Sequence, residues 1–345
     1  MPARRGGDLP HRPHACVTEP AHLRGRRGAA AIRAIVLAHE FADLDGIAAS
    51  MNPDAFCTSD QWSGIAAASS TSQLAGVLGG FLITAIALVF DRSSREGAHT
   101  LALFASAVLI LMLDSYLFSL ISGTHPSDTG DRQSICAIAW TQGNLATGML
   151  AAGTTGLFGG LGWMLASHAV NKTPKDDPSD IGAYCFLGEL GGWLTFGAAM
   201  TTTLIMSETS IDYLHSMLGH PPALWLTGSI ATFCAAAILL DFVLVYIRTR
   251  TLSRSLKAAQ PTELALRSIK VATVGTLFLA VAASWLAVSV ARLPVGWLTA
   301  PNRAFVLLVF VLSLLVPTVV STAICYSVAS THEGLTRQRR FMSRQ

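Results

Sequence analysis

Charged residues are scarce in this 345-residue chain. Lys and Arg number 24 and Asp and Glu 21, so charged residues make up 13% of the sequence, about half the share that soluble globular proteins carry. Hydrophobic residues make up 51%, and the mean hydropathy is +0.49. Because one soluble core would not bury so many apolar side chains, the composition indicates a membrane protein. A net charge of +3 leaves no basic surplus for phosphates, which argues against a nucleic-acid partner, and the apolar content argues against disorder.

Signatures of catalysis and cofactor binding are also missing. The sequence has no phosphate-binding loop, no HExxH, no GxSxG and no dinucleotide-binding fingerprint. No CxxC pair occurs, and the His and Asp residues of the predicted outer loops do not follow a zinc spacing, so we expect neither a metal nor a cofactor. The last apolar run has no lysine, which excludes a retinal Schiff base. These absences argue against an enzyme without deciding the question.

Long apolar runs fill most of the remaining sequence. A helix of about 20 apolar residues crosses the roughly 30 Å of hydrocarbon in a bilayer. The seven predicted spans cover residues 72–90, 100–121, 145–167, 184–206, 223–247, 269–291 and 304–328. The runs do not alternate as barrel strands do, and a helix satisfies its own backbone amides, so the fold class is an all-α polytopic transmembrane bundle.

The chain divides into three parts. A polar head, residues 1–71, precedes the transmembrane domain, residues 72–331, and a basic tail covers residues 332–345. Seven arginines crowd the first 33 residues, whereas the stretch from Met51 to the first span has no Lys or Arg. We therefore expect the head to be disordered, or Met51 to be the natural start.

Cations predict the orientation of the bundle, because Lys and Arg near the ends of spans stay on the cytoplasmic side. Fourteen of them lie in the tail and in the loops after the first, third and fifth spans, against three in the other loops. The protein is therefore expected in the inner (plasma) membrane with a cytoplasmic C-terminus. The basic segment 248–268 on that side is expected to touch anionic lipid.

Two of the six cysteines are expected to form a disulfide. Cys57, just before the first span, and Cys136, just before the third, fall on the same outer side, where an oxidising compartment permits the bond. The alternative is two free thiols whose Cα atoms lie too far apart.

Three acids lie within the predicted spans, and ionisable residues inside a membrane are functional candidates by default. Glu189 and Asp241 are predicted at a similar depth near the cytoplasmic side, where Lys270 and Arg248 are the cations within reach. The three interpretations are a structural interhelical ion pair, a coupled proton or cation site, and side chains that snorkel to the membrane interface.

Asp114 stands apart from those acids, in the outer half of the second span, with no cation near it. We expect it to face the bundle interior as a neutral or hydrogen-bonded group. The alternatives are a proton relay and an interhelical hydrogen bond.

Small residues and one proline predict how the helices pack. Gly148, Ala152, Gly156 and Gly160 recur at every fourth position of the third span and favour close approach of a neighbouring helix, either as a tight contact of the first, third and fourth spans or as a substrate path or dimer seam. Pro317 is expected to kink the last span, as a hinge or for packing.

The sequence therefore predicts a multi-pass membrane protein, with small-solute or proton-coupled ion translocation as the first functional hypothesis. Asp114, Glu189 and Asp241 are its candidate coupling acids. The alternative is a non-catalytic membrane subunit, scaffold or sensor that acts through protein partners, as a homo-oligomer or with another membrane protein.

Overall fold

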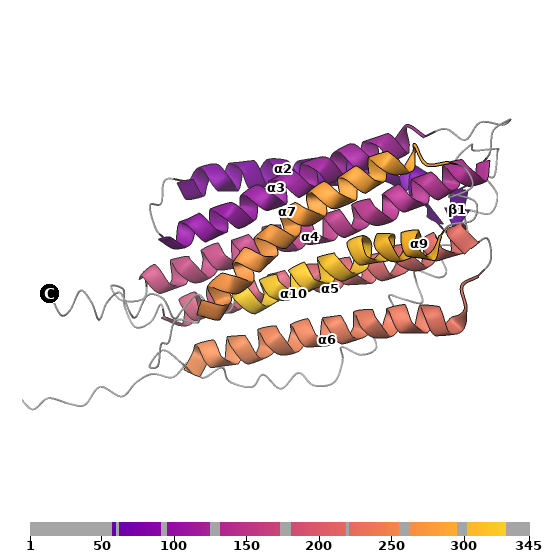
Figure 1. Cartoon of the computed structure of the whole chain (residues 1–345). Helices are drawn as coiled ribbons and strands as arrows, with labels where there is room; N and C mark the ends of the chain where they lie inside the picture. Colours follow the sequence, from indigo (N-terminus) through magenta and orange to yellow (C-terminus); the bar gives the residue numbers. More distant parts are fainter. Residues whose placement is uncertain are drawn as a thin grey trace, which may run out of the picture.

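The computed structural model describes residues 57–59, 62–90, 95–124, 132–172, 181–218, 221–254, 263–294 and 302–328. Seven long helical segments and one pair of very short strands make up this part of the chain (Figure 1). The elements are β1 (Thr58–Ser59), β2 (Trp62–Ser63), α2 (Gly64–Phe90), α3 (Arg95–Ser122), α4 (Arg132–Lys172), α5 (Ile181–Leu218), α6 (Leu224–Arg254), α7 (Glu263–Val290), α9 (Arg303–Phe310), the π-helix η4 (Val311–Leu315) and α10 (Val316–Val328). The predicted tail, residues 332–345, lies outside the described residues, as does the predicted head up to residue 56. The last eight residues of that head, 64–71, belong to α2, which begins before the predicted first span.

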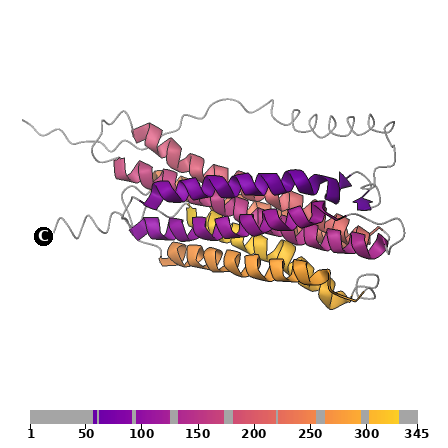
Figure 2. The same cartoon turned by 90° about the horizontal axis from the view of Figure 1, so that it is seen from above.

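The helices run side by side in one bundle (Figures 1 and 2). Helix α4 packs against α3, α5, α7 and α10, and is the hub of the bundle. Helix α2 packs mainly on α3, while α6 lies at an edge and touches α5 and α10. The antiparallel pair β1 and β2 lies at the end of the bundle where α2 begins. We call this the disulfide end, because Cys57 and Cys136 are bonded there.

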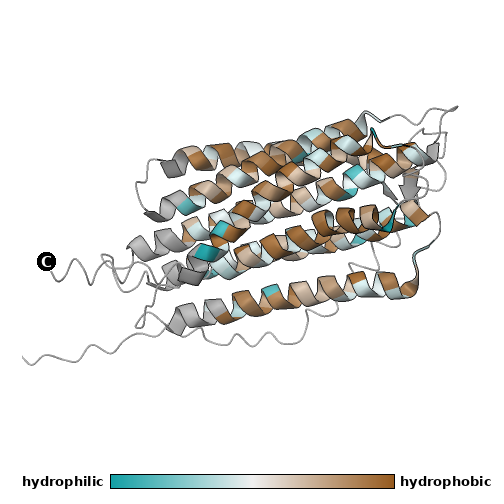
Figure 3. Ribbon diagram, viewed as in Figure 1, coloured by the Kyte–Doolittle hydropathy of each residue, from teal (hydrophilic) through white to brown (hydrophobic). Residues whose placement is uncertain are grey.

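Within the described residues, five helices are long and apolar enough to cross a membrane, which indicates a helical membrane protein. They contain the stretches Gly64–Ala87, His99–Ser122, Leu224–Ile247, Arg267–Val290 and Arg303–Ser327. Many of their large apolar side chains are exposed, as expected for surfaces that face lipid, and hydrophobic residues cover most of the bundle in Figure 3. The predicted count of seven spans is not confirmed, because α4 and α5 are not among these five.

The two remaining helices, α4 and α5, are longer and more polar than the sequence predicted. Helix α4 starts at residue 132 instead of 145, and α5 ends at residue 218 instead of 206. Both extensions lie toward the disulfide end. Most of α4 between Ser134 and Trp163 is buried among other helices, so its side chains need not be apolar all round. This explains why α4 can carry Gly, Thr, Asn and Gln where a lipid-facing helix carries Leu or Val.

The small residues of α4 allow close contact with two neighbours, η4 and α3. A Cβ atom added to Gly148 would lie 2.6 Å from the Ser313 carbonyl oxygen, so this glycine lets α4 meet the backbone of η4. Gly156 and Gly160 instead face Ala107 and Phe104 of α3. Ala152, between them, is fully buried in the main hydrophobic core.

The expected tight contact of the first, third and fourth spans is therefore only partly right. Helix α4 does pack closely on α5, where a Cβ atom on Gly191 would lie 2.7 Å from the Gly162 Cα atom. Helix α2 touches α4 little and packs instead on α3. There the Ser72 and Ser115 hydroxyls donate hydrogen bonds to each other's carbonyl oxygens, at 2.8 and 2.9 Å.

Candidate functional site

Asp114 lies in the second half of α3, about two turns before its end, and is completely buried. Neither of its carboxyl oxygens has a hydrogen-bond partner within the described part of the chain. The helices packed against α3 are α2, α4 and α7. No charged residue occurs in α2, between residues 133 and 167 of α4, or between residues 271 and 290 of α7. Asp114 therefore has neither a counter-ion nor a described hydrogen bond, unlike the interhelical bond that one interpretation expected.

The pairing of α3 with α4 fixes the depth of Asp114. The two helices run antiparallel, and Gly153 contacts Leu111 while Gly160 contacts Phe104. Each residue further along α3 therefore lies opposite a residue one position earlier in α4. Asp114, three residues beyond Leu111, lies opposite Leu150.

Asp241 lies on α6 and is 2% exposed. Its carboxyl group takes a hydrogen bond from Thr322 of α10, and its Oδ1 atom has no partner among the described residues. The second acid therefore occupies the interface of α6 and α10, away from Asp114 on α3.

Glu189 and Asp241 do not share one depth, which corrects the sequence interpretation. Gly192 of α5 packs against Val245 and Thr249 of α6, so Glu189, three residues earlier, lies opposite the end of α6. Asp241 is about eight residues further along the bundle, or roughly 12 Å at the rise of an α-helix. The prediction failed because α6 continues to residue 254 instead of ending at 247.

The predicted cations do not gather around these acids. Lys270 is exposed on α7, and its charge acts on His99 of α3. The side chain of Arg248 lies outside the described residues. Glu189 is half-buried on α5. The predicted ion-pair layer is therefore not assembled by the described side chains.

A hydrogen-bonded polar network holds α4, α5 and η4 together. The Asn144 side-chain amide donates to the Ser313 hydroxyl at 3.0 Å, and the Ser210 hydroxyl donates to the Asn144 Oδ1 atom at 3.3 Å. Nearby, the Gln142 amide donates to the Ala287 carbonyl oxygen of α7 at 2.9 Å. Such bonds between transmembrane helices are stabilising, and here they all radiate from α4.

One turn toward the disulfide end, Tyr213 of α5 is fully buried beside Thr141 of α4. Its hydroxyl has no hydrogen bond of good geometry to a described residue. Its ring packs against Phe310, with ring centroids 6.0 Å apart.

Pro317 is accommodated by a change of helix type. The π-helix η4 lies directly before it, and the Val316 amide bonds to the Val311 carbonyl oxygen, five residues back. Proline has no N–H to give to the carbonyl four residues before it, which here is that of Ser313. The wider π turn contains Ser313, whose backbone lies against Gly148 of α4.

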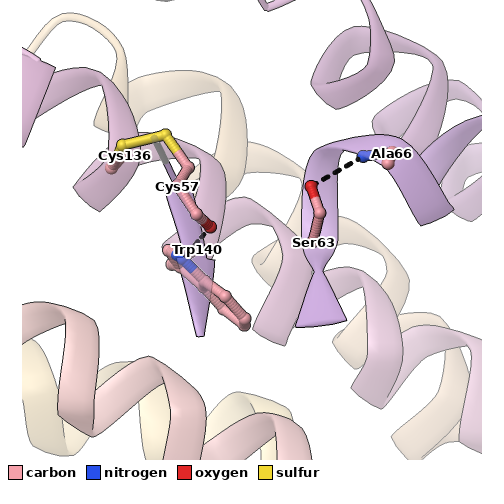
Figure 4. Close-up of a disulfide and its surroundings, with 5 residues drawn as sticks. All are labelled: Cys57, Ser63, Ala66, Cys136 and Trp140. Atoms are coloured by element: carbon pink, nitrogen blue, oxygen red, sulfur yellow. Dashed lines mark hydrogen bonds between the residues drawn. A yellow bond between two sulfur atoms is a disulfide. The ribbon is translucent and has the colours of Figure 1, made fainter. Parts of the chain in front are cut away.

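Cys57 and Cys136 are joined by a disulfide with their Cα atoms 5.2 Å apart (Figure 4). The bond ties the chain before α2 to the first turns of α4. The Trp140 indole N–H reinforces it by donating to the Cys57 carbonyl oxygen at 3.1 Å. Ser63 then begins α2 as an N-cap, accepting the Ala66 amide at 3.2 Å.

Behind the disulfide lies a cavity of about 20 Å³. Four helices and the disulfide segment contribute to it. Its lining residues are Cys57, Gly64, Ile65, Phe118, Ile121, Ala139, Trp140, Gly143, Thr147 and Thr209. Neither Asp114 nor Asp241 belongs to this lining.

Sequence reasoning missed the polar network and Tyr213 as parts of one site. Tyr213 and Ser210 lie beyond the predicted end of the fourth span, and they are buried only because α5 continues to residue 218. A polar spacing of three residues, Thr141 with Asn144 and Ser210 with Tyr213, was the available signal, since such pairs share one helix face.

Comparisons with known proteins found no matching family model, no similar curated protein and no similar solved structure. Among the described residues, no group of three or more His, Cys, Asp or Glu side chains could hold a metal ion.

Proposed function

We propose that this membrane protein translocates a small solute or ion by coupling its movement to proton binding at Asp114. The observation that supports the proposal is the complete burial of Asp114 without a partner at either carboxyl oxygen. A carboxyl group inside a membrane protein is expensive to bury, and a structural role would give it hydrogen bonds or a counter-ion. Reversible proton binding would explain why the protein has a carboxyl group at this buried position.

Asp241 is the second candidate coupling acid of this proposal. It is also buried and is only partly satisfied, by Thr322. It lies on a different interface from Asp114, so the proposal gives each acid a separate place in the cycle. Glu189, half-buried near one end of the bundle, has the weakest support as a coupling acid.

The proposal places all seven helical segments across the membrane. Helices α4 and α5 exceed the length of a span at 41 and 38 residues. Their mean hydropathy is lower than that of a lipid-facing span, because neighbouring helices enclose them and because they extend beyond the apolar layer at the disulfide end. The distribution of Lys and Arg supports a plasma-membrane protein whose disulfide end faces outward, which agrees with the chemistry of a disulfide.

Translocation also requires helices that can change their arrangement. The π-helical turn η4 before Pro317 is a local irregularity at the centre of the bundle, in contact with α4 through Gly148. π-Helical turns are often found at functional sites. The described conformation, with Asp114 sealed among helices, is then the closed state of the cycle.

Proton flux in vesicles tests the proposal. The purified protein is reconstituted with a pH-sensitive dye inside, and a panel of small ions and polar solutes is added outside. We expect at least one solute to drive proton movement in the wild type and in Glu189→Gln, and none to do so in Asp114→Asn.

Two outcomes contradict the proposal. One is a wild-type protein that moves no protons with any solute of the panel. The other is an Asp114→Asn variant with wild-type flux. Either result favours the alternative of a scaffold or subunit that acts through protein partners.

A further inference from the structure

We infer that the cavity behind the disulfide is a hydrophobic gate on the route by which outside water reaches Asp114, with Phe118 as its floor. The inference rests on the proposed function and concerns how the site of proton binding is closed from one side. It follows from three features of the described residues: the shared face of α3, the register of α3 against α4, and the chemistry of the cavity lining.

The face of α3 that carries Asp114 also lines the cavity. Phe118 and Ile121, both lining residues, follow Asp114 at spacings of four and seven residues. Residues so spaced lie on one side of a helix, one above the other. The cavity therefore lies directly above Asp114 in the direction of the disulfide end, and Phe118 is the side chain one turn away from the carboxyl group.

The register of α3 against α4 shows how near the cavity lies to Asp114. Ile121 and Gly143 both line the cavity at one level, in keeping with the pairing of Leu111 with Gly153 deeper in the bundle. Thr147 is the lining residue of α4 closest to the membrane centre, and Asp114 lies opposite Leu150. Three residues of helix separate these levels, or about 4.5 Å. One layer of side chains thus divides the cavity from the buried acid.

The lining explains why the route is shut in this conformation. The two threonine hydroxyls already donate to carbonyls of their own helices, Thr147 to Gly143 at 2.9 Å and Thr209 to Ile205 at 2.7 Å. The other lining side chains are apolar, apart from the Trp140 indole N–H, which is bonded to Cys57. A cavity of about 20 Å³ has room for one water molecule. The lining offers that water no free donor and only the two threonine hydroxyl oxygens as acceptors, so a continuous file of water has little to bind, and an apolar constriction of this kind closes a path.

Thiol labelling tests the gate independently of transport. In a background in which the four cysteines outside the disulfide are replaced, Asp114→Cys supplies a thiol at the buried position. A small, membrane-impermeant methanethiosulfonate is added outside intact cells. We expect slow labelling with Phe118 present and labelling about ten-fold faster or more with Phe118→Ala, because removal of the ring lets water and reagent through.

Leu111→Ala is the matched control. Leu111 is fully buried on the same face of α3, one turn from Asp114 on the opposite side, where it packs on Gly153. Its truncation loosens the core without opening the path from the cavity, so outside labelling of the thiol should stay slow. Should Phe118→Ala fail to fold, as judged by loss of the disulfide, Phe118→Val is the substitute.

Equal labelling rates in the Phe118 and Leu111 variants would overturn the gate. So would equal labelling of the Phe118→Ala variant from outside and from inside. The proposed function fails separately, by an Asp114→Asn variant that keeps its proton flux. The two ideas can therefore be rejected one without the other.

Discussion

Replacement of Asp114 by leucine should stabilise the protein. Both carboxyl oxygens are buried without a described partner, and the side chain is similar in size to leucine. A buried polar group left unsatisfied costs about 1–3 kcal/mol, whereas an apolar group of similar shape avoids that cost. We therefore expect Asp114→Leu to raise the free energy of unfolding by about 1–3 kcal/mol, less any strain from the two methyl groups, which are larger than the carboxyl oxygens they replace.

Unfolding in detergent, by heat or by increasing denaturant, measures this change. Asn144→Leu is the control of opposite sign, because it removes two hydrogen bonds and leaves Ser210 and Ser313 without their partner. That variant should lose about 1–3 kcal/mol. A loss of similar size for Asp114→Leu would refute the reasoning, since it would mean that Asp114 makes a stabilising bond.

Three further predictions concern packing and the disulfide end. Gly148→Ala should lower the free energy of unfolding by about 1–3 kcal/mol, because the added Cβ atom would meet the backbone of η4. Gly80→Ala is the control and should cost nothing, since its added Cβ atom would have no atom within 4 Å. Equal unfolding midpoints for the two variants would contradict this prediction. Cys57 and Cys136 should react with maleimide only after reduction. Replacement of both by serine should lower the free energy of unfolding by about 2–4 kcal/mol, because the bond closes a long loop in the unfolded chain. Trp140→Phe should cost about 1 kcal/mol through its lost bond, and an unchanged midpoint would show that the bond contributes nothing.

Apolar runs predicted the helical class and the places of five spans, because lipid-facing helices must be apolar on most of their surface. The ends of α4 and α5 could not be read in this way. Their extensions are buried by neighbouring helices, and burial by protein leaves no apolar run in the sequence. Gln142, Asn144 and Ser210 look like loop residues in sequence because their hydrogen-bond partners lie on other helices.

The isolation of Asp114 was predictable because the lack of charged residues near it is a property of the sequence itself. The different depths of Glu189 and Asp241 were not predictable, because depth depends on where each helix ends, and α6 ends seven residues later than expected. The disulfide partners followed from topology, since both cysteines precede spans on one side. The π turn before Pro317 depends on room beside Gly148, which only the packed bundle reveals.

Proton flux through the Asp114→Asn variant tests the central claim most directly. The measurement compares solute-driven proton entry into vesicles that contain equal amounts of folded wild-type and variant protein. The account predicts that the flux is lost in the variant while its unfolding midpoint does not fall. A flux equal to that of the wild type, or a loss of flux accompanied by a lowered unfolding midpoint, would contradict it.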